Sequence, residues 1–291
     1  MQNELFSDGP PADRPARPEK LGPASIEYVS ANSILSPATG FMADYDYTLN
    51  PYSGCSFACD YCYAAAFARS EQLQRDWGRW VKVKQDALDK LRRVRRDLEG
   101  RWIYMSSVTD PYQPIESKLF LVRDLLEELV RRGARLVVQT RSPLVVRDAD
   151  LLERLRQVQV NMTVTTDSEE VRRDFEPICP GNDRRLEAVR ELSERGIATA
   201  VTMTPLLPVR DPVAFARDLR DSGASHFVVQ PLHPPSSGGR FRAATPSRAR
   251  EFMQKYEWDS ERHADAVRRM REVLPVLEEG KRGFAPPREV E

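Results

Sequence analysis

The sequence predicts an α/β fold in which parallel strands and helices alternate and wind into a barrel or part of one. After residue 100, short apolar runs rich in β-branched residues are followed by charged segments with helical periodicity, and this rhythm repeats. Gly133, Gly196 and Gly223 stand where three of these helical segments are expected to end. Because crossovers between parallel strands are right-handed, such units wind in one direction, with active-site groups on the loops after the strands.

Six strands and five helices are expected in chain order. The strands are residues 47–50, 102–106, 135–140, 160–165, 198–204 and 226–231, where β-branched and apolar residues gather. The helices are residues 81–98, 119–132, 149–158, 184–195 and 212–222, where apolar residues recur every three or four positions. The helix at 81–98 has a basic outer face, which we interpret as a solvated surface, with nucleic-acid contact as the alternative.

The two ends of the chain differ from this central rhythm. Residues 1–25 are rich in proline and charge and poor in apolar groups, which predicts a disordered tail. Residues 26–235 form the expected partial barrel, and residues 236–291 form a loop followed by a helical extension. The loop carries Arg240, Phe241 and Arg242 beside two glycines, so it is either a plain surface loop or one that stacks on and pairs with a base of the substrate.

The composition is typical of a cytoplasmic enzyme. The 44 Lys and Arg residues balance 44 Asp and Glu residues, so no overall charge draws the chain to nucleic acid or to an anionic membrane. No stretch is long and apolar enough for a membrane span, and the N-terminus lacks the apolar core of a signal peptide. We therefore expect a cytoplasmic location and no membrane partner. Four cysteines in 291 residues also make a poor disulfide scaffold.

Three of the four cysteines, Cys55, Cys59 and Cys62, stand close together in a CxxxCxxC spacing. Three thiolates on one loop suit a shared inorganic centre. Zinc fits poorly, because structural zinc takes four protein ligands and the three histidines of the chain lie far downstream. A disulfide with a spare thiol, or a set of unconnected core cysteines, would also account for the cysteine count. A 4Fe-4S cluster is the favoured interpretation, since three thiolates would leave one iron open to an exogenous chelator.

This cysteine loop, placed after a first strand and before a series of βα units, resembles that of the radical S-adenosylmethionine (SAM) superfamily. The segments DYTLNPYSGCSFACDYCYA, SSVTDPYQPIE, TRSPLVVRDADLL and TVTTDSEEVRRDFEP, with the following RLEAVRELSERGI, are similar to the spore photoproduct lyase-like family, also described as DNA repair photolyase-like. The resemblance extends over about residues 33–208. It implies a partial (β/α)6 TIM-like barrel of the radical SAM type, a 4Fe-4S cluster on Cys55, Cys59 and Cys62, and S-adenosylmethionine at the open iron.

The resemblance also implies the activity. One electron from the reduced cluster splits the sulfonium of SAM, giving methionine and a 5′-deoxyadenosyl radical that abstracts a hydrogen atom from the substrate. The expected enzyme is spore photoproduct lyase-like, a carbon–carbon lyase or a related enzyme, with a flavodoxin or ferredoxin as electron donor. Damaged DNA or another nucleic acid is the substrate that the resemblance suggests, and a peptide or small molecule is the alternative. A cluster-containing nucleic-acid-binding module without radical chemistry is the competing hypothesis.

Polar residues near the cysteines and at the end of the second strand are assigned to SAM by the same resemblance. Tyr61 and Tyr63 flank Cys62 and are similar to tyrosines that lie beside SAM and take part in hydrogen-atom transfer; packing around the cluster is the alternative. Thr109 and Asp110 follow the second strand, where an acceptor can bind the ribose hydroxyls or the methionine ammonium of SAM.

Later strand ends carry further candidates. Arg141 resembles the lysine or arginine that the family places near the methionine carboxylate, which a guanidinium fork suits; a surface salt bridge is the alternative. Thr165 and Thr204 align to positions that hydrogen-bond the ribose and adenine of SAM. Glu176, with Arg185 expected within its reach, is interpreted as part of a structural turn.

One departure from the lyase family concerns the hydrogen atom returned to the substrate. In spore photoproduct lyases a cysteine just after the second strand donates it, and the matching place here reads Ser106, Ser107 and Val108. A serine O–H bond is too strong to donate a hydrogen atom readily. Cys179 is the one thiol outside the cysteine loop, so it is either a replacement donor, and thereby catalytic, or a small buried hydrophobe.

Overall fold

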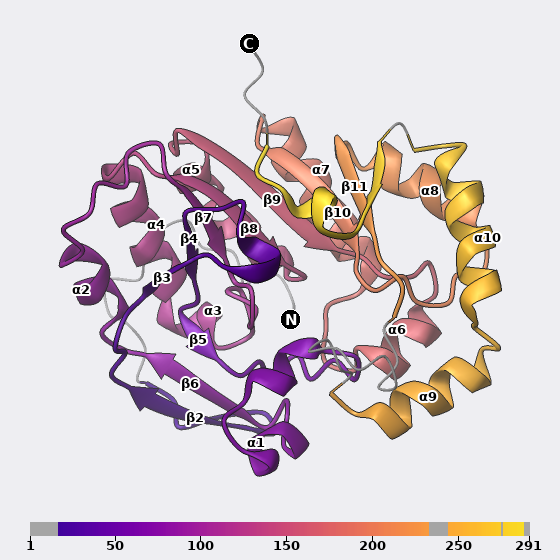
Figure 1. Cartoon of the computed structure of the whole chain (residues 1–291), viewed down its shortest axis with the longest axis horizontal. Coiled ribbons are helices and arrows are strands. Elements are labelled where there is room, and N and C mark those ends of the chain that lie inside the picture. The colour runs from indigo at the N-terminus through magenta and orange to yellow at the C-terminus, as the bar shows by residue number, and fades with distance from the viewer. Residues whose placement is uncertain (1–16, 233–243, 275, 288–291) are drawn as a thin grey trace, which may run out of the picture.

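The computed structural model describes residues 17–232, 244–274 and 276–287, and its main feature is an eight-stranded sheet curved into a partial barrel (Figure 1). The strand order is β12-β11-β10-β9-β8-β7-β4-β3. All neighbouring pairs are parallel except β3 with β4. Because β3 and β12 are the two edges of this sheet, the barrel is open between them. The predicted α/β partial barrel is confirmed.

Six strands of the large sheet correspond to the six that the sequence predicts. They are β4 (Tyr47–Leu49), β7 (Trp102–Met105), β8 (Arg135–Thr140), β9 (Gln157–Thr163), β10 (Ala198–Met203) and β11 (His226–Val229). The central strands are buried on both faces, as expected for a parallel sheet covered by helices. The edge strands β3 (Leu35–Pro37) and β12 (Leu277–Glu279) are additional, because three residues are too few for a periodic pattern to stand out.

Helices connect successive strands and cover the outside of the large sheet (Figure 1). They are α3 (Glu116–Leu119), α4 (Leu121–Arg131), α5 (Ala149–Leu152), α6 (Glu169–Phe175), α7 (Asn182–Glu194) and α8 (Pro212–Asp221). The start of α8 shows how the sequence sets these elements: the Asp211 side chain accepts hydrogen bonds from the N–H groups of Val213 and Ala214. Pro212 then occupies the first helical position, where no N–H donor is required.

The C-terminal extension is helical, as predicted. Its helices are α9 (Pro246–Lys255) and α10 (Ser260–Arg271). α10 packs against α8, and α9 packs against α6, so the extension covers the side of the barrel formed by the later strands (Figure 1). Within the described residues, no helix has the length and apolar character that crossing a bilayer requires.

A second, four-stranded sheet lies beside the first half of the barrel and is absent from the sequence prediction. Its order is β1-β2-β6-β5, with β1 (Lys20–Leu21), β2 (Ala24–Val29), β5 (Tyr52–Ser53) and β6 (Trp80–Lys84). Strand β5 ends two residues before Cys55, so this sheet anchors the N-terminal end of the cysteine loop.

Two sequence predictions are corrected by this sheet. The helix predicted over residues 81–98 is wrong in its first part, because Val81 and Val83 alternate with lysines and are buried on one face of β6. Only α2 (Ala87–Arg92) is helical there, although Leu98 is still buried as the helical pattern required. The predicted disordered tail, residues 1–25, is also too long, since strands β1 and β2 begin within it. Residues 1–16 lie outside the described residues, as does the segment with Arg240, Phe241 and Arg242.

One further helix is shorter than predicted. The apolar pattern at 149–158 predicts a single helix, whereas the chain forms a 3-10 turn, η3 (Pro143–Asp148), then α5, and enters β9 at Gln157. Val158 therefore belongs to a strand, and its apolar character reflects the sheet core rather than a helix face.

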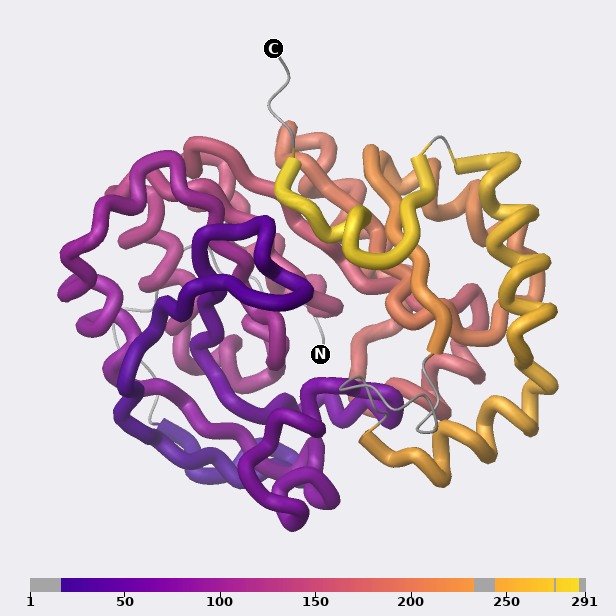
Figure 2. The backbone as a smooth tube through the Cα atoms, in the orientation of Figure 1, coloured from indigo at the N-terminus to yellow at the C-terminus, as the bar shows by residue number. Residues whose placement is uncertain are grey.

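The two edges of the barrel are bridged by short 3-10 segments. η1 (Gly40–Met42) follows edge strand β3, and η5 (Gly280–Phe284) follows edge strand β12. Tyr45 Oη donates to the Phe284 carbonyl at 2.8 Å, and the Phe41 and Phe284 rings meet edge to face with centroids 5.5 Å apart. Lys281 Nζ lies 3.0 Å from Asp44 Oδ2. Figure 2 shows these early and late segments side by side, and we call this contact the η1–η5 seam.

Candidate active site

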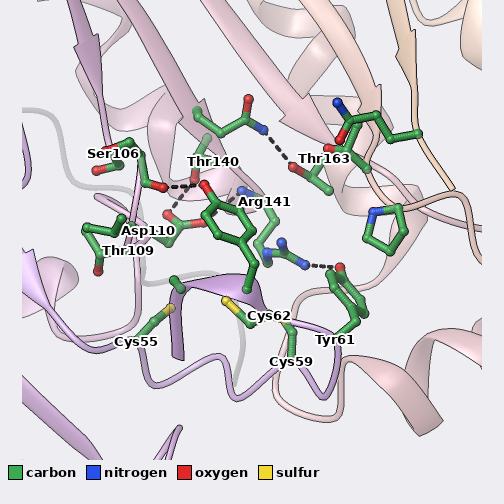
Figure 3. A pocket seen from close by; sticks show the side chains of 18 of the residues that line it. Cys55, Cys59, Tyr61, Cys62, Ser106, Thr109, Asp110, Thr140, Arg141 and Thr163 are labelled. Carbon is green, nitrogen blue, oxygen red and sulfur yellow. Dashed lines mark hydrogen bonds between the residues drawn. The ribbon is translucent and has the colours of Figure 1, made fainter. Parts of the chain in front are cut away.

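The three cysteines of the loop line one cavity inside the barrel, with a volume of about 200 Å³. Cys55 and Cys59 are buried, Cys62 is partly exposed, and all three are free thiols. Figure 3 shows them on one side of the cavity, facing the strand ends that carry Asp110 and Arg141. The loop can begin only with glycine, because a Cβ at Gly54 would come within 2.5 Å of the Trp80 carbonyl oxygen and φ is +77° there.

Side chains from the loop after β7 hold the start of the cysteine loop in place. Thr109 Oγ1 donates to the Gly54 carbonyl at 2.7 Å, and Gln113 Nε2 donates to the same oxygen at 3.3 Å. Gln113 Oε1 accepts the backbone N–H of Ser56 at 3.0 Å. Thr109, predicted as a SAM contact, lines the cavity, but its hydroxyl proton is directed to the loop. Gln113 has no counterpart in the sequence prediction, since its partners lie 57 and 59 residues away in the chain.

The C-terminal extension holds the same loop from its other side. Thr245, at the start of α9, donates its hydroxyl to Asp60 Oδ1 at 2.6 Å, and its backbone N–H to the Asp60 carbonyl at 3.0 Å. Arg248 Nη1 lies 3.4 Å from the same carboxylate. The cysteine loop is therefore fixed between the barrel and α9.

Asp110 is buried and organises the end of strand β8. Its Oδ1 accepts hydrogen bonds from Thr140 Oγ1 at 2.7 Å and from the Tyr112 N–H at 2.9 Å, and its Oδ2 accepts the Arg141 N–H at 2.9 Å. Burial raises the pKa of Asp110, opposed by the hydrogen bond from Thr140. Asp110 thus lines the cavity, and its carboxylate also fixes the position of the backbone from which the Arg141 side chain extends.

Behind the cysteine loop, Glu176 joins Arg141 to Tyr61. Glu176 is fully buried; its Oε1 accepts hydrogen bonds from the Tyr61 hydroxyl, from Arg141 Nη1 at 3.1 Å and from Thr165 Oγ1 at 2.8 Å. Arg185 Nη2 binds Oε2 at 2.6 Å. Arg141 Nη1 also donates to Tyr61 Oη at 2.6 Å, a contact visible in Figure 3. We call Tyr61, Arg141, Thr165, Glu176 and Arg185 the site cluster.

The charge of this cluster follows from its composition. Burial alone would raise the pKa of Glu176, yet Arg185 and Arg141 together lower it to about 2. One carboxylate is therefore shared by two guanidinium groups, and the cluster carries an excess positive charge beside the three cysteines. Arg141 lines the cavity, so its charge reaches the space in which a ligand lies.

Tyr63 differs from Tyr61 in its surroundings. Its side chain lines the cavity, donates its hydroxyl to the Ser107 carbonyl and is 38% exposed. Its ring meets that of Phe67 edge to face, with centroids 6.2 Å apart. Tyr61 is 7% exposed and bound on both sides. The sequence analysis expects the same role for Tyr61 and Tyr63. In the structure, Tyr61 is a fixed side chain and Tyr63 is an accessible one.

The remaining predicted residues divide between the cavity and its surroundings. Thr204 lines the cavity, whereas Thr165 is directed to Glu176 and Thr163 lines the cavity in its place. Cys179 lies behind the loop, with its Sγ 3.5 Å from Cys59 Sγ and 6% exposed, and does not line the cavity. This position does not support its prediction as a hydrogen-atom donor at the mouth of the barrel.

Glu176, like Gln113, is a site residue whose contacts the sequence pattern does not reveal. The predicted pair with Arg185 is present, but its interpretation as a structural turn leaves out the contacts with Tyr61 and Arg141. A fully buried carboxylate must be paired with a counter-charge, and Arg185 stands nine residues after Glu176. This spacing is a local signal from which the Glu176–Arg185 pair can be predicted. The contacts with Tyr61 and Arg141 span 115 and 35 residues and leave no local pattern.

The donor set bears on which inorganic centre fits. Among the described residues, no three His, Cys, Asp or Glu side chains are close enough to hold a single metal ion. Three thiols that line one cavity, spread along one loop, instead suit a cluster that distributes its ligands over several irons. The positive charge of Arg141 beside them suits an anionic centre. The residues present therefore fit a 4Fe-4S cluster better than a mononuclear zinc site.

Comparison with known proteins gives the family. Residues 49–222 match the sequence profile of the Radical SAM superfamily. An uncharacterized protein of Methanocaldococcus jannaschii is 36% identical over 162 residues, covering 56% of this chain and 61% of that protein. The radical SAM Nalpha-GlyT isomerase of Pseudomonas phage M6 is 25% identical over 162 residues, covering 54% of this chain and 32% of that protein. The chain thus spans only part of the length of these relatives.

Solved structures of spore photoproduct lyase share the fold. One superposes with a TM-score of 0.61 at 14% identity, covering 91% of this chain and 86% of the other. A second, complexed with dinucleoside spore photoproduct, gives a TM-score of 0.58 at 15% identity over 87% and 81% of the two chains. The family implies S-adenosylmethionine and a 4Fe-4S cluster as cofactors. With a matching profile over more than half of its length, this chain belongs to the radical SAM superfamily.

Proposed function

We propose that this chain is a radical SAM enzyme that reductively cleaves S-adenosylmethionine and abstracts a hydrogen atom from a substrate derived from nucleic acid. The observation that carries the first part is the convergence on one cavity of three free thiols from one loop with Asp110 and Arg141 from the facing strand ends. A soft donor set and a guanidinium in the same space suit a cluster and a carboxylate ligand.

The residues have separable roles in this proposal. Cys55, Cys59 and Cys62 would hold the 4Fe-4S cluster, which with bound SAM supplies the one-electron cleavage that yields a 5′-deoxyadenosyl radical. Arg141 binds the methionine carboxylate, oriented by Glu176 through Nη1. Asp110 holds the Arg141 backbone and offers its remaining lone pairs to the SAM ammonium or ribose.

The two tyrosines take different parts. Tyr61 is fixed by Glu176 and Arg141, so we assign it to orienting the guanidinium. Tyr63 lines the cavity and is accessible, so it is the better candidate for passing a hydrogen atom between substrate and cofactor. Thr204, directly after β10, offers its hydroxyl group to the adenosine portion, whereas Thr163 on β9 lines the cavity with its hydroxyl already bound to Gln139.

The substrate class is drawn from the structural neighbours. Spore photoproduct lyase, which shares the fold over most of both chains, has been solved with a dinucleoside photoproduct. A peptide or a small molecule is the alternative within the same chemistry. A nucleic-acid-binding module without radical chemistry is less well supported, because the predicted basic helix is divided between β6 and α2 and Lys82 is paired with Glu27 at 2.8 Å.

Anaerobic reconstitution with iron and sulfide tests the proposal. The wild-type protein should gain visible cluster absorbance, and after reduction with dithionite in place of a flavodoxin or ferredoxin it should convert SAM to 5′-deoxyadenosine and methionine. Cys59→Ala should lose both the absorbance and the product, because each thiolate ligand is required to hold the cluster.

Cys179→Ala is the matched control. Its sulfur lies 3.5 Å from that of Cys59 but outside the cavity, so the variant should keep the cluster and form 5′-deoxyadenosine at a rate within about twofold of wild type. Absence of 5′-deoxyadenosine from the reduced, reconstituted wild type would refute the proposal. Loss of the cluster in Cys179→Ala would refute the assignment of its ligands.

A further inference from the structure

The side chains that line the cavity include two chemically different groups, which we call its two ends. At one end lie the three cysteines, and beside them Asp110 and Arg141, which are the charged side chains among the described residues that line it. The other end is a group of uncharged lining side chains, Phe41, Met42, Tyr104 and Phe284, which belong to one apolar cluster. The cofactor chemistry proposed above uses side chains of the first end and none of these four.

The uncharged end belongs to the η1–η5 seam. Phe41 and Met42 come from η1 and Phe284 from η5, all outside residues 49–222, which match the superfamily profile. η5 lies directly on the inner face of the sheet, because a Cβ at Gly283 would come within 2.5 Å of Val228 Cγ1. Phe284 packs there with Tyr45, Tyr104 and Val228 in one apolar group. The segments that complete this end therefore lie outside the part of the chain that the superfamily profile describes.

The polar groups nearest this end are already paired with one another. Tyr104 Oη donates to Gln139 Oε1 at 3.0 Å, and Gln139 Nε2 donates to Thr163 Oγ1 at 2.8 Å and to Thr202 Oγ1 at 3.0 Å. A charged ligand group placed here would lose its hydration without gaining a counter-charge, which is costly. Flat apolar groups instead gain contact with the Phe41 and Phe284 rings.

One buried hydroxyl among the side chains that line the cavity is different. Ser106 is 3% exposed, lines the cavity, and within the described residues its Oγ has no hydrogen-bond partner. Its φ of +76° lies in the left-handed region, which is unusual for a residue with a side chain. Ser106 therefore departs from the extended backbone of strand β7, which ends one residue before it. A ligand held between the two ends can satisfy this hydroxyl with a carbonyl or amide group.

We propose that the η1–η5 seam is the substrate-selecting wall of the cavity, and that it takes an uncharged, flat ring whose polar edge meets Ser106. This rests on the proposed function and deepens it: the ring is the part of the substrate next to the reacting centre, while charged parts such as phosphates stay outside the cavity. Met42, Phe41 and Phe284 then determine which rings fit.

Binding to reconstituted, SAM-loaded protein tests the wall. The probes are thymidine and 5-carboxy-2′-deoxyuridine, which differ only in a methyl group and a carboxylate on the same ring. Thymidine should bind at millimolar or lower concentration, and the carboxylate analogue about tenfold more weakly or worse, since it brings a charge to the uncharged wall. This comparison requires no variant, so it stands even if a substitution prevents folding.

Met42→Lys places a charge on the wall and should weaken thymidine binding by about tenfold or more. The matched control is Leu119→Lys, which alters a side chain that is also partly buried but lies outside the cavity; it should bind thymidine as wild type does. Equal binding of the two nucleosides, no thymidine binding by wild type, or wild-type binding by Met42→Lys would each overturn the proposal. Failure of the proposed function appears separately, as absence of 5′-deoxyadenosine.

Discussion

Two buried Tyr–Glu–Arg clusters flank the cysteine loop and differ in how their charges are balanced. The site cluster has Tyr61 within the loop and one carboxylate, Glu176, shared by two arginines. The other, which we call the support cluster, consists of Tyr52, Glu116, Arg147 and Asp148. Tyr52 precedes the loop and donates to Glu116, whose Oε1 lies 2.8 Å from Arg147 Nη2; the same nitrogen lies 2.7 Å from Asp148 Oδ2.

The same three residue types therefore give opposite electrostatics. In the support cluster two carboxylates share Arg147, and Asp148 also pairs with Arg123 at 3.2 Å. Burial raises the pKa of Glu116 to about 7, opposed by Arg147. In the site cluster two arginines share Glu176, and the pKa of Glu176 falls to about 2 despite its burial. Only the site cluster lines the cavity, through Tyr61 and Arg141. Excess positive charge is therefore kept where an anionic centre and a carboxylate are expected, while the support cluster serves stability.

The largest expected difference in folding stability is between two single variants, each of which removes the glutamate carboxylate of one cluster. Glu176→Gln leaves Arg141 and Arg185 buried without a counter-charge and should lower the free energy of unfolding by about 3–5 kcal/mol. Glu116→Gln leaves Arg147 paired with Asp148 and should cost about 1 kcal/mol at pH 8. Urea unfolding of the cofactor-free proteins measures both values. Equal losses from the two variants would contradict the charge assignment.

The stabilities of the same two variants should also respond differently to pH. Folded Glu116 keeps its proton up to about pH 7, whereas the unfolded residue loses it near 4.5, so its stabilising contribution falls as pH rises through this window. Between pH 5 and 8, Glu116→Gln should therefore gain on the order of 2–3 kcal/mol relative to wild type.

Glu176 has the opposite sign. Its pKa is lower when folded, so its contribution is complete above the unfolded value near 4.5 and is lost only as pH falls toward about 2. The deficit of Glu176→Gln relative to wild type should stay constant between pH 5 and 8 and shrink below about 4.5. A deficit that changes between pH 5 and 8 would show that Glu176 is not ionised as described.

The smallest expected contrast comes from the two phenol groups. Tyr61→Phe removes one of the two acceptors of Arg141 Nη1, which loosens the guanidinium and should raise the KM for SAM by about fivefold, equivalent to about 1 kcal/mol. Tyr52→Phe removes the hydroxyl that donates to Glu116 and should cost about 1 kcal/mol of folding stability while leaving this KM unchanged. A similar KM for both variants and wild type would remove Tyr61 from the binding machinery.

The large sheet and the cysteine loop can be predicted from sequence because their signals are local. Strand β8 (Arg135–Thr140) matches its predicted range, and the CxxxCxxC spacing locates three thiols that line one cavity. Arg141 and Asp110 are also predictable, since Arg141 directly follows β8 and Asp110 lies in the loop after the neighbouring strand β7, and these strands end at the same edge of the sheet. Thr165 does not line the cavity as predicted, because strand β9 ends at Thr163 and the chain then turns toward Glu176.

The remaining features depend on contacts that are distant in sequence. The small sheet pairs β2 with β6, so the period-2 pattern of Val81 and Val83 competes with a helical continuation through Leu91 and Leu98. Glu176 binds Arg141, which lies 35 residues away in the chain, and the η1–η5 seam joins Tyr45 to Phe284 across 239 residues. No local periodicity records such pairs.

The electron paramagnetic resonance spectrum of the reduced, reconstituted cluster, recorded with and without SAM, tests most directly whether the cysteines and Arg141 share one site. SAM should change the spectrum of wild type and of Glu116→Gln at similar concentrations. Glu176→Gln should require a higher concentration of SAM, because Arg141 loses the carboxylate that orients it. Spectra of the wild type that are identical with and without SAM would contradict the central claim that the three thiols and Arg141 together form the cofactor site.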